Sequence, residues 1–470
     1  MARANTVQST TQSIAVDSKS KRPKLSNDRI STLPDSVLCH ILSFLPTKYA
    51  VRTSILSTKW KYLWTSVHSL DFDDSVTMSN LYVSRTKKGR AQKEKQIQAQ
   101  RKSFMNFVDR VLILHNVSCL RKFRLHCRIV DDMLHVNTWV CAAIGRDVQD
   151  LDLYVSLEQP LQLPRSLFTC NMLVVLKLSC EIVVNTPAEG SVCFPNLKIL
   201  HLKRVKYVSD DSVRKLFPSC PVLEDLLIWR CNDDNVITFS IFASALKRLI
   251  IDSGSQDSLD YNKLEINAPA LEYLNLTDGR SDYFPFQNLS SLVEAHLVVH
   301  HGGGRLVNDY GYIIFHLLHR LSNVKFLFLS VDDMKPLTDS HYKSPTFHKL
   351  TRLEVHVRSC NWNILPNLLE RCDNLEVLVL SKESKRHGDP HESCWIQAQP
   401  LFLHLTTVVI SGFEGLTDEL ELVQYILENA EVLKTMTIKM CSLDIEAKFD
   451  VLQKISMFQR RSKTCQVGFT

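Results

Sequence analysis

The chain has 470 residues, enough for about three domains or for one long array of repeats. Apolar residues make up 45% and charged residues 23%, which is ordinary for a soluble protein, and no apolar run is long enough to predict a membrane span. The fourteen cysteines include no C-x-x-C pair, so the sequence predicts no structural zinc site, and we expect no metal and no cofactor.

Residues 1–27 are predicted to form a disordered basic tail. They lack the apolar stretch of a secretory signal, so we expect reduced cysteines and a location in the nucleus, the cytoplasm or both. The tail contains the basic cluster KSKRPK at Lys19–Lys24. Such a cluster is typical of a nuclear address, and equally of a solvated tail that aids solubility.

Residues 28–72 are predicted to form three short helices. Pro34 suits the first position of a helix, and apolar residues follow at helical spacing as far as Leu45. Ser57 is a good N-cap for the third helix. That helix is expected to carry Trp60, Leu63 and Trp64. About forty residues bury little surface alone, so this segment is expected to need a partner or an attached domain.

The segment resembles an F-box in the Leu-Pro at its start and in the stretches ILSFLP and LSTKWKYLW. The resemblance implies that it docks a Skp-type adaptor and through it joins the cullin and RING subunits of an SCF-type ubiquitin ligase. The alternative is that these apolar residues form the core of a small helical bundle, and some are expected to do both. The residues that match the family's adaptor-facing positions are Leu33, Pro34, Ile41, Leu42, Leu45, Trp60, Leu63 and Trp64.

Residues 73–103 are predicted to be a disordered basic insert. Between positions 85 and 102 the chain carries eight Lys or Arg against one Glu, and such polar segments rarely fold. Residues 85–102 carry a net charge of +7 and residues 1–29 carry +4, which together exceed the net charge of +6 of the whole chain, so the rest of the chain is mildly acidic. We therefore expect no nucleic-acid partner and no membrane partner for the folded part.

Residues 104–399 are organised by a repeated apolar triplet whose members are separated by two residues and then by one. Thirteen copies, mostly 21 to 30 residues apart, run from Leu120-Phe123-Leu125 to Leu433-Met436-Ile438, past the end of this region. The spacing is the leucine-rich-repeat signature L-x-x-L-x-L. It predicts an irregular α/β solenoid with a parallel sheet on its concave side and helices or irregular segments on its convex side.

The last two apolar residues of each triplet point inward, so the residue between them and the residue after them point outward. In the middle turns the outward residues Leu227, Trp229 and Ile250 are apolar and lie on neighbouring predicted strands. An apolar patch with an aromatic anchor is typical of an interface centre, so these three are candidate substrate-binding residues. The alternative is that the basic insert or the tail covers them.

Residues 400–470 are interpreted as the end of the array. The stretch GFEGLTDELELVQYILENA resembles the FBD domain, which follows the repeats in many plant F-box proteins. It predicts a strand, a glycine-containing turn, an amphipathic helix and a further strand. We expect this part to cap the array, because a final repeat otherwise leaves its apolar edge in water.

The sequence contains none of the motifs G-x-G-x-x-G, G-x-S-x-G and H-E-x-x-H, and we assign no catalytic residue. A cysteine nucleophile would suit ubiquitin chemistry, but Cys180 and Cys231 fall at repeat positions where a thiol usually packs. The chain thus resembles the plant F-box/LRR/FBD family. The resemblance implies a non-catalytic substrate-recognition subunit of an SCF-type E3 ubiquitin ligase, whose repeats bind a protein substrate. The alternative is a non-catalytic repeat scaffold that acts outside a ubiquitin ligase.

Overall fold

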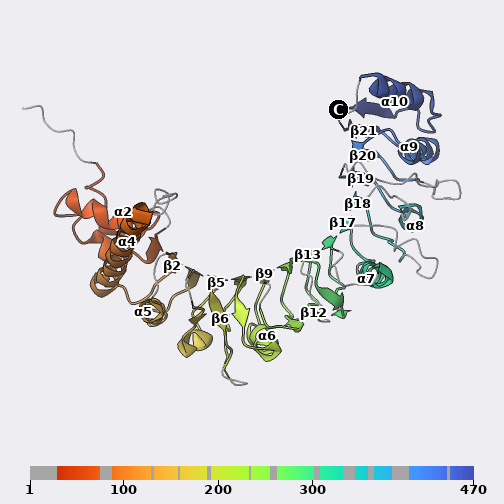
Figure 1. The fold of residues 1–470 in the computed structure, drawn as a ribbon. Coiled ribbons are helices and arrows are strands. Elements are labelled where there is room, and N and C mark those ends of the chain that lie inside the picture. The colour runs from red at the N-terminus through yellow and green to blue at the C-terminus, as the bar shows by residue number, and fades with distance from the viewer. Residues whose placement is uncertain are drawn as a thin grey trace, which may run out of the picture.

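The protein is a long arc with one sheet along its inner side and helices along its outer side (Figure 1). The computed structural model describes residues 29–74, 87–128, 132–156, 159–187, 192–231, 234–254, 262–300, 307–331, 345–357, 365–383, 402–441 and 445–470. The predicted tail, 1–27, lies outside them. No helix in these ranges is long and apolar enough to cross a membrane.

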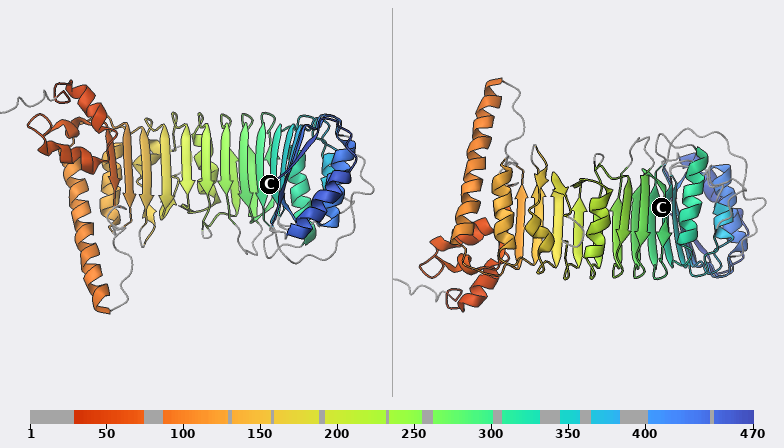
Figure 2. Two further views of the ribbon diagram at one scale, coloured as in Figure 1. Left: turned by 90° about the horizontal axis from the view of Figure 1, so that it is seen from above. Right: turned by 90° about the horizontal axis from the view of Figure 1, so that it is seen from below.

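The inner sheet has fifteen strands within the described ranges, all parallel and paired in chain order (Figure 2). They are β1 (Ser69–Asp73), β2 (Lys122–Cys127), β3 (Asp150–Val155), β5 (Val175–Cys180), β7 (Ile199–Lys203), β9 (Asp225–Trp229), β11 (Arg248–Asp252), β13 (Tyr273–Asp278), β16 (Glu294–Val299), β17 (Phe326–Val331), β18 (Arg352–Val357), β19 (Val377–Lys382), β20 (Thr407–Phe413), β21 (Thr435–Met440) and β22 (Gln466–Phe469).

Each of the thirteen triplets supplies the two inward residues of one strand, which confirms the predicted solenoid. In β9 and β11, for example, Leu226 lies beside Leu249 and Ile228 beside Ile251, and all four side chains are fully buried. This register repeats along the sheet, so the leucines form one continuous core. A single turn could not bury its own apolar side, and stacking supplies the missing contacts.

The convex side carries helices along much of the arc and short strands near its middle (Figure 1). The helices are α5 (Met133–Ile144), η3 (Arg165–Thr169), α6 (Asp210–Leu216), η4 (Phe217–Ser219), α7 (Val307–Arg320), α8 (Leu365–Leu369), α9 (Thr417–Asn429) and α10 (Ile445–Met457). The strands form two small parallel sheets: β4 (Leu161–Gln162), β6 (Ile182–Val184) and β8 (Lys206–Tyr207); and β10 (Thr238–Phe242), β12 (Asn262–Asn267), β14 (Ser281–Tyr283) and β15 (Phe286–Gln287). The sequence did not predict these outer sheets.

The F-box segment contains α1 (Asp35–Leu42), α2 (Thr47–Arg52) and two 3-10 helices, η1 (Thr53–Ile55) and η2 (Leu63–Ser66). The predicted third helix is only partly formed, because residues 58–62 form turns and the 3-10 helix η2 carries Leu63 and Trp64 but not Trp60. Contacts with the chain before α1 explain the difference. Lys59 Nζ donates to the carbonyl of Ser31 at 2.7 Å, and Trp60 Nε1 donates to the hydroxyl of Ser31 at 2.9 Å. Such tertiary contacts override a modest helical propensity.

The predicted disorder of the basic insert is also wrong where it can be compared. Residues 75–86 lie outside the described ranges, but α4 (Lys87–Leu114) is one continuous helix whose amino-terminal end extends past the edge of the sheet (Figure 2). Its carboxyl-terminal half is anchored, since Val108 and Val111 are buried and Trp139 Nε1 of α5 donates to Asp109 at 2.7 Å. Once that half is nucleated, extension through Ala, Gln, Lys and Arg costs little.

The FBD segment joins the same sheet through β20, β21 and β22, and a buried charge cluster ties it to the repeats. Lys382, at the end of β19, places Nζ 2.5 Å from Glu419 of α9 and 3.0 Å from Glu414. Burial alone lowers the pKa of Lys382, but the charge of Glu419 and the hydrogen bonds to both carboxylates outweigh it and raise that pKa. The predicted buried stripe of α9 is confirmed at Leu422, Val423, Ile426 and Leu427, whereas Leu420, which was also predicted, is only half-buried.

The junction between the F-box segment and α4 depends on a buried histidine, which predicts a pH dependence. His115 Nε2 lies 2.7 Å from the carbonyl of Val67, and burial lowers the His115 pKa below its ordinary value. The unfolded chain takes up a proton near pH 6.5 while the folded protein resists it, so the free energy of unfolding should fall as the pH drops below about 6.5. Urea midpoints at pH 7.5 and pH 5.5 measure this. His115→Gln keeps a hydrogen-bond donor but removes the titrating group, so the difference between the two urea midpoints should become smaller. An unchanged difference would mean that other titratable groups cause the pH dependence.

Candidate protein-interaction sites

The apolar residues of the F-box segment divide into a buried set and an exposed set. The buried set joins the segment to the continuous core of the repeats and includes Leu38, Leu42, Trp60, Leu63 and Trp64. The exposed set, which we name the F-box face, comprises Ile30, Val37, Ile41, Phe44, Leu45, Tyr49, Ile55, Leu56 and Tyr62. Phe44 is 75% exposed and Ile55 is 85% exposed. So many exposed apolar side chains on one small segment indicate that another protein covers part of its surface.

Three of the predicted adaptor-facing residues, Pro34, Ile41 and Leu45, are exposed, and Leu33 is half-buried. The other four, Leu42, Trp60, Leu63 and Trp64, are buried by the chain itself, which gives them a role in the core of the segment. Sequence reasoning missed most of the F-box face. Phe44 and the Ile55-Leu56 pair fall outside the apolar stripe of α1. A search for apolar residues at helical spacing does not select residues outside such a stripe.

The concave patch of Leu227, Trp229 and Ile250 lies where the sequence placed it. Leu227 of β9 and Ile250 of β11 are side by side in register, and both are half-buried. Trp229 is 42% exposed and is covered on one side by Lys203, whose Nζ lies 4.5 Å from the ring centroid. The described part of the basic insert, α4, lies beside the F-box segment at one end of the arc, away from this patch (Figure 1).

A second aromatic group on the concave face was not predicted. Tyr273, His296 and Phe326 lie on three successive strands, with ring centroids 5.5 Å and then 5.0 Å apart. Arg248 stacks on Tyr273 and Arg352 on Phe326, with guanidinium carbons 4.5 Å and 5.5 Å from the centroids. The sequence does contain a signal for this group. Side chains alternate between the two faces of a strand, so the residue just before the first leucine of each strand also points outward. The outward positions inferred from each triplet start one residue later, so they do not include Tyr273 and Phe326.

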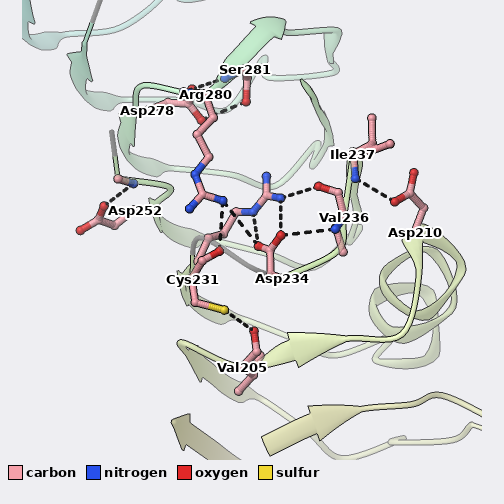
Figure 3. A network of polar contacts seen from close by, with 12 residues as sticks. Val205, Asp210, Cys231, Asp234, Val236, Ile237, Asp252, Asp278, Arg280 and Ser281 are labelled. Atoms are coloured by element: carbon pink, nitrogen blue, oxygen red, sulfur yellow. Dashed lines mark hydrogen bonds and ion pairs between the residues drawn. The ribbon is translucent and has the colours of Figure 1, made fainter. Parts of the chain in front are cut away.

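A buried ion network fixes the turn that follows Trp229 (Figure 3). Arg230 donates to both carboxylate oxygens of Asp234, at 2.6 Å and 2.9 Å, and to the carbonyl of Val236. Arg280, from the turn after β13, donates to the carbonyl of Cys231 at 3.1 Å and lies 3.9 Å from Asp234. The three charged side chains are at most 4% exposed. The network links turns of repeats that are not adjacent in the sheet, and so holds the backbone that presents Trp229.

Among the described cysteines, every thiol with a shifted pKa has it raised above the ordinary value. Burial raises the pKa of Cys220 and of Cys372 to about 12, whereas a cysteine nucleophile needs a lowered pKa. Cys231, at a predicted repeat position, donates to the carbonyl of Val205 at 3.4 Å, as a structural thiol does. Among the described residues there is no group of three His, Cys, Asp or Glu that could hold a metal ion.

Comparison with known proteins matches three regions of the chain. The F-box domain family matches residues 30–72. The family described as "FBD-associated F-box protein At5g56370, LRR repeats" matches residues 136–285, and the FBD family matches residues 399–438. The Probable FBD-associated F-box protein At1g32375 of Arabidopsis thaliana is 32% identical over 455 residues, which cover 94% of this chain and 100% of that protein. This chain belongs to the plant FBD-associated F-box/LRR family.

Two other relatives from Arabidopsis thaliana match most of the chain. The F-box/FBD/LRR-repeat protein At5g56420 is 33% identical, with 94% of this chain and 99% of that protein covered. The F-box/LRR-repeat protein At4g14103 is 36% identical over 77% of this chain and 95% of its own length. The resemblance drawn from the F-box, repeat and FBD motifs is therefore confirmed. F-box/LRR proteins of this family are generally non-catalytic, and F-box domains generally bind Skp-type adaptors.

Proposed function

We propose that this F-box/LRR protein is the substrate-recognition subunit of an SCF-type E3 ubiquitin ligase. The F-box face would dock a Skp-type adaptor, and through it the cullin and RING subunits, while the concave face would hold a protein substrate. The observation that carries the proposal is the F-box face itself. Nine apolar side chains remain exposed on a segment whose other apolar residues are packed into the repeats. Covering such a surface with an apolar partner is favourable by about 25 cal/mol for each Å² removed from water.

The rigidity of the array suits a scaffold that acts by proximity. The F-box segment shares one core with the repeats, so its orientation relative to the concave face is fixed by packing rather than by a linker. A substrate held on that face would keep a defined position relative to a ubiquitin-carrying enzyme bound at the far side of the ligase. Proximity of this kind accelerates transfer without any reactive group on the scaffold. The protein would act in the nucleus, the cytoplasm or both.

Truncation of the concave patch should weaken substrate binding while sparing the adaptor. Trp229→Ala removes an exposed aromatic anchor, and loss of such an anchor typically costs about 2 kcal/mol or more, roughly a thirtyfold fall in affinity. Proximity labelling in cells treated with a proteasome inhibitor compares the proteins near the wild type and near the variant. Tyr283→Ala is a matched control, since Tyr283 is also exposed and also lies under a lysine, Lys263, but on the outer sheet. Equal losses in the two variants would contradict a role for the concave patch.

The second candidate function is a repeat scaffold that acts outside a ubiquitin ligase. It is favoured by the burial of Leu42, Trp60, Leu63 and Trp64, which gives these F-box residues a structural role within the chain. Purification of the full chain after co-expression with a Skp-type adaptor separates the two. A stable complex containing adaptor, cullin and RING subunits supports the ligase. A folded chain that recovers no adaptor supports the scaffold.

A further inference from the structure

The two ends of the inner sheet are finished differently. At the amino-terminal end the outer edge of β1 is covered, since the backbone N–H of Asp71 donates to Thr47 Oγ1 of α2 at 2.7 Å and Phe72 contacts Phe107 of α4. At the other end, β22 pairs only with β21 within the described ranges. The N–H groups of Gln466 and Thr470 point toward β21. Because successive N–H groups along a strand alternate in direction, those of Val467 and Phe469 point to the open side.

The helix of the last turn, α10, is apolar on two faces. Val451 and Ile455 are buried against the array. Ile445, Phe449 and Leu452 follow each other at spacings of four and three, which places them together on another face. Their side chains are 89%, 66% and 37% exposed. Figure 1 shows α10 as the last helix on the outer side of the arc, at the end opposite the F-box segment.

The strand of the last turn is likewise incompletely covered. Val467 and Phe469 point inward, beside Met436 and Ile438 of β21. Met436 and Ile438 are fully buried, but Val467 and Phe469 are only half-buried. Solenoids normally end in a turn with a polar outer face, and edge strands normally carry a charge, a proline or a bulge. β22 reads Gln-Val-Gly-Phe and has none of these. The last turn, which the sequence was expected to use as a cap, therefore leaves part of its apolar surface uncovered.

We propose that this terminal face, formed by the exposed side of α10 and the open edge of β22, binds the same face of a second copy of the chain. The occupant must offer a strand edge and an apolar helix face side by side, and the last turn of a second copy offers both. Glu446, Lys448, Asp450 and Lys454 balance the charge of α10, so two copies do not repel each other there. Head-to-tail stacking is blocked because the edge of β1 is covered, which leaves a closed, twofold dimer.

The dimer would join two arcs at the ends far from their F-box segments (Figure 1). The F-box face and the concave patch of each copy therefore stay accessible. The two strands β22 would pair edge to edge, and the two helices α10 would pack through Phe449. The inference does not depend on ligase activity, because the residues that carry it lie in neither of the other two surfaces.

Sedimentation velocity of the purified full chain, from low to high micromolar concentration, tests the dimer. The wild type should show twice the mass of one chain. Ile445→Glu combined with Phe449→Glu should raise the dimer dissociation constant about a hundredfold, since two apolar side chains lose their contacts. Leu134→Glu on α5 is a matched control, because Leu134 is 77% exposed but distant from this face, and it should leave the dimer intact.

Hydrogen exchange provides a second readout that a merely unstable variant would not reproduce. The amides of Val467 and Phe469 should be protected in the wild type and exchange freely in the double variant, while the amide of Ile438 stays protected in both. A wild type that sediments as one chain at every concentration overturns the proposal. So does a dimer that survives the double substitution, or one in which the Val467 and Phe469 amides exchange freely.

Discussion

Replacement of Ile41 and Phe44 by aspartate should abolish co-purification with a Skp-type adaptor. Both side chains belong to the F-box face, with Ile41 42% exposed and Phe44 75% exposed, so the substitutions leave the buried core of the segment intact. Loss of two apolar contacts of about 1.5 kcal/mol or more each reduces affinity at least a hundredfold. The measurement is adaptor recovered per mole of chain after co-expression, followed by titration of the purified components.

The control for this experiment follows from the burial of the remaining residues. Leu42 was expected to contact the adaptor, but it is only 1% exposed. A charged substitution there would damage the fold, and the resulting loss of adaptor would not report on direct contact. Leu134→Asp is the appropriate control, since it adds the same charge at an exposed leucine on α5. Wild-type adaptor recovery in the Ile41 and Phe44 double variant would remove the main support for docking through the F-box face.

Substitution of Asp234 by alanine should cause a large loss of stability. Asp234 is 3% exposed and carries two hydrogen bonds from Arg230, and Arg280 lies 3.9 Å away. Without Asp234, two buried guanidinium groups would lose a shared counter-charge. Removing one partner from a buried ion pair costs about 3 to 5 kcal/mol in the free energy of unfolding. Urea and thermal unfolding of the full chain measure the change.

Two further variants identify the cause of that loss. Asp211→Ala removes a carboxylate that also pairs with an arginine, Arg214, but on the protein surface, and should cost less than about 1 kcal/mol. Asp234→Leu combined with Arg230→Met should recover part of the stability, because replacing both partners avoids an unpaired buried charge. A single variant at Asp234 that unfolds like the wild type would show that solvent reaches the two arginines.

The sequence by itself determined the solenoid, its strand order and the location of the F-box and FBD segments. Each of the thirteen apolar triplets specifies which two residues of a strand point inward. A strand whose register shifted by one residue would expose both of them. The short-range helical pattern likewise located α1 and α9. The concave patch of Leu227, Trp229 and Ile250 followed from the same alternation, since it needs only the register of neighbouring strands. These features depend on local periodicity, which a linear sequence displays directly.

The tertiary structure alone decided which apolar residues remain on the surface. Leu42 and Ile41 are adjacent and equally apolar, yet the array covers one and leaves the other exposed, because only packing determines which side of α1 meets the repeats. The same holds for α10, where Phe449 is exposed while Ile455 is buried. The network of Arg230, Asp234 and Arg280 joins residues about fifty positions apart, and α4 extends through a polar sequence because its distant half is anchored. Long-range contacts of this kind leave no periodic trace in the sequence.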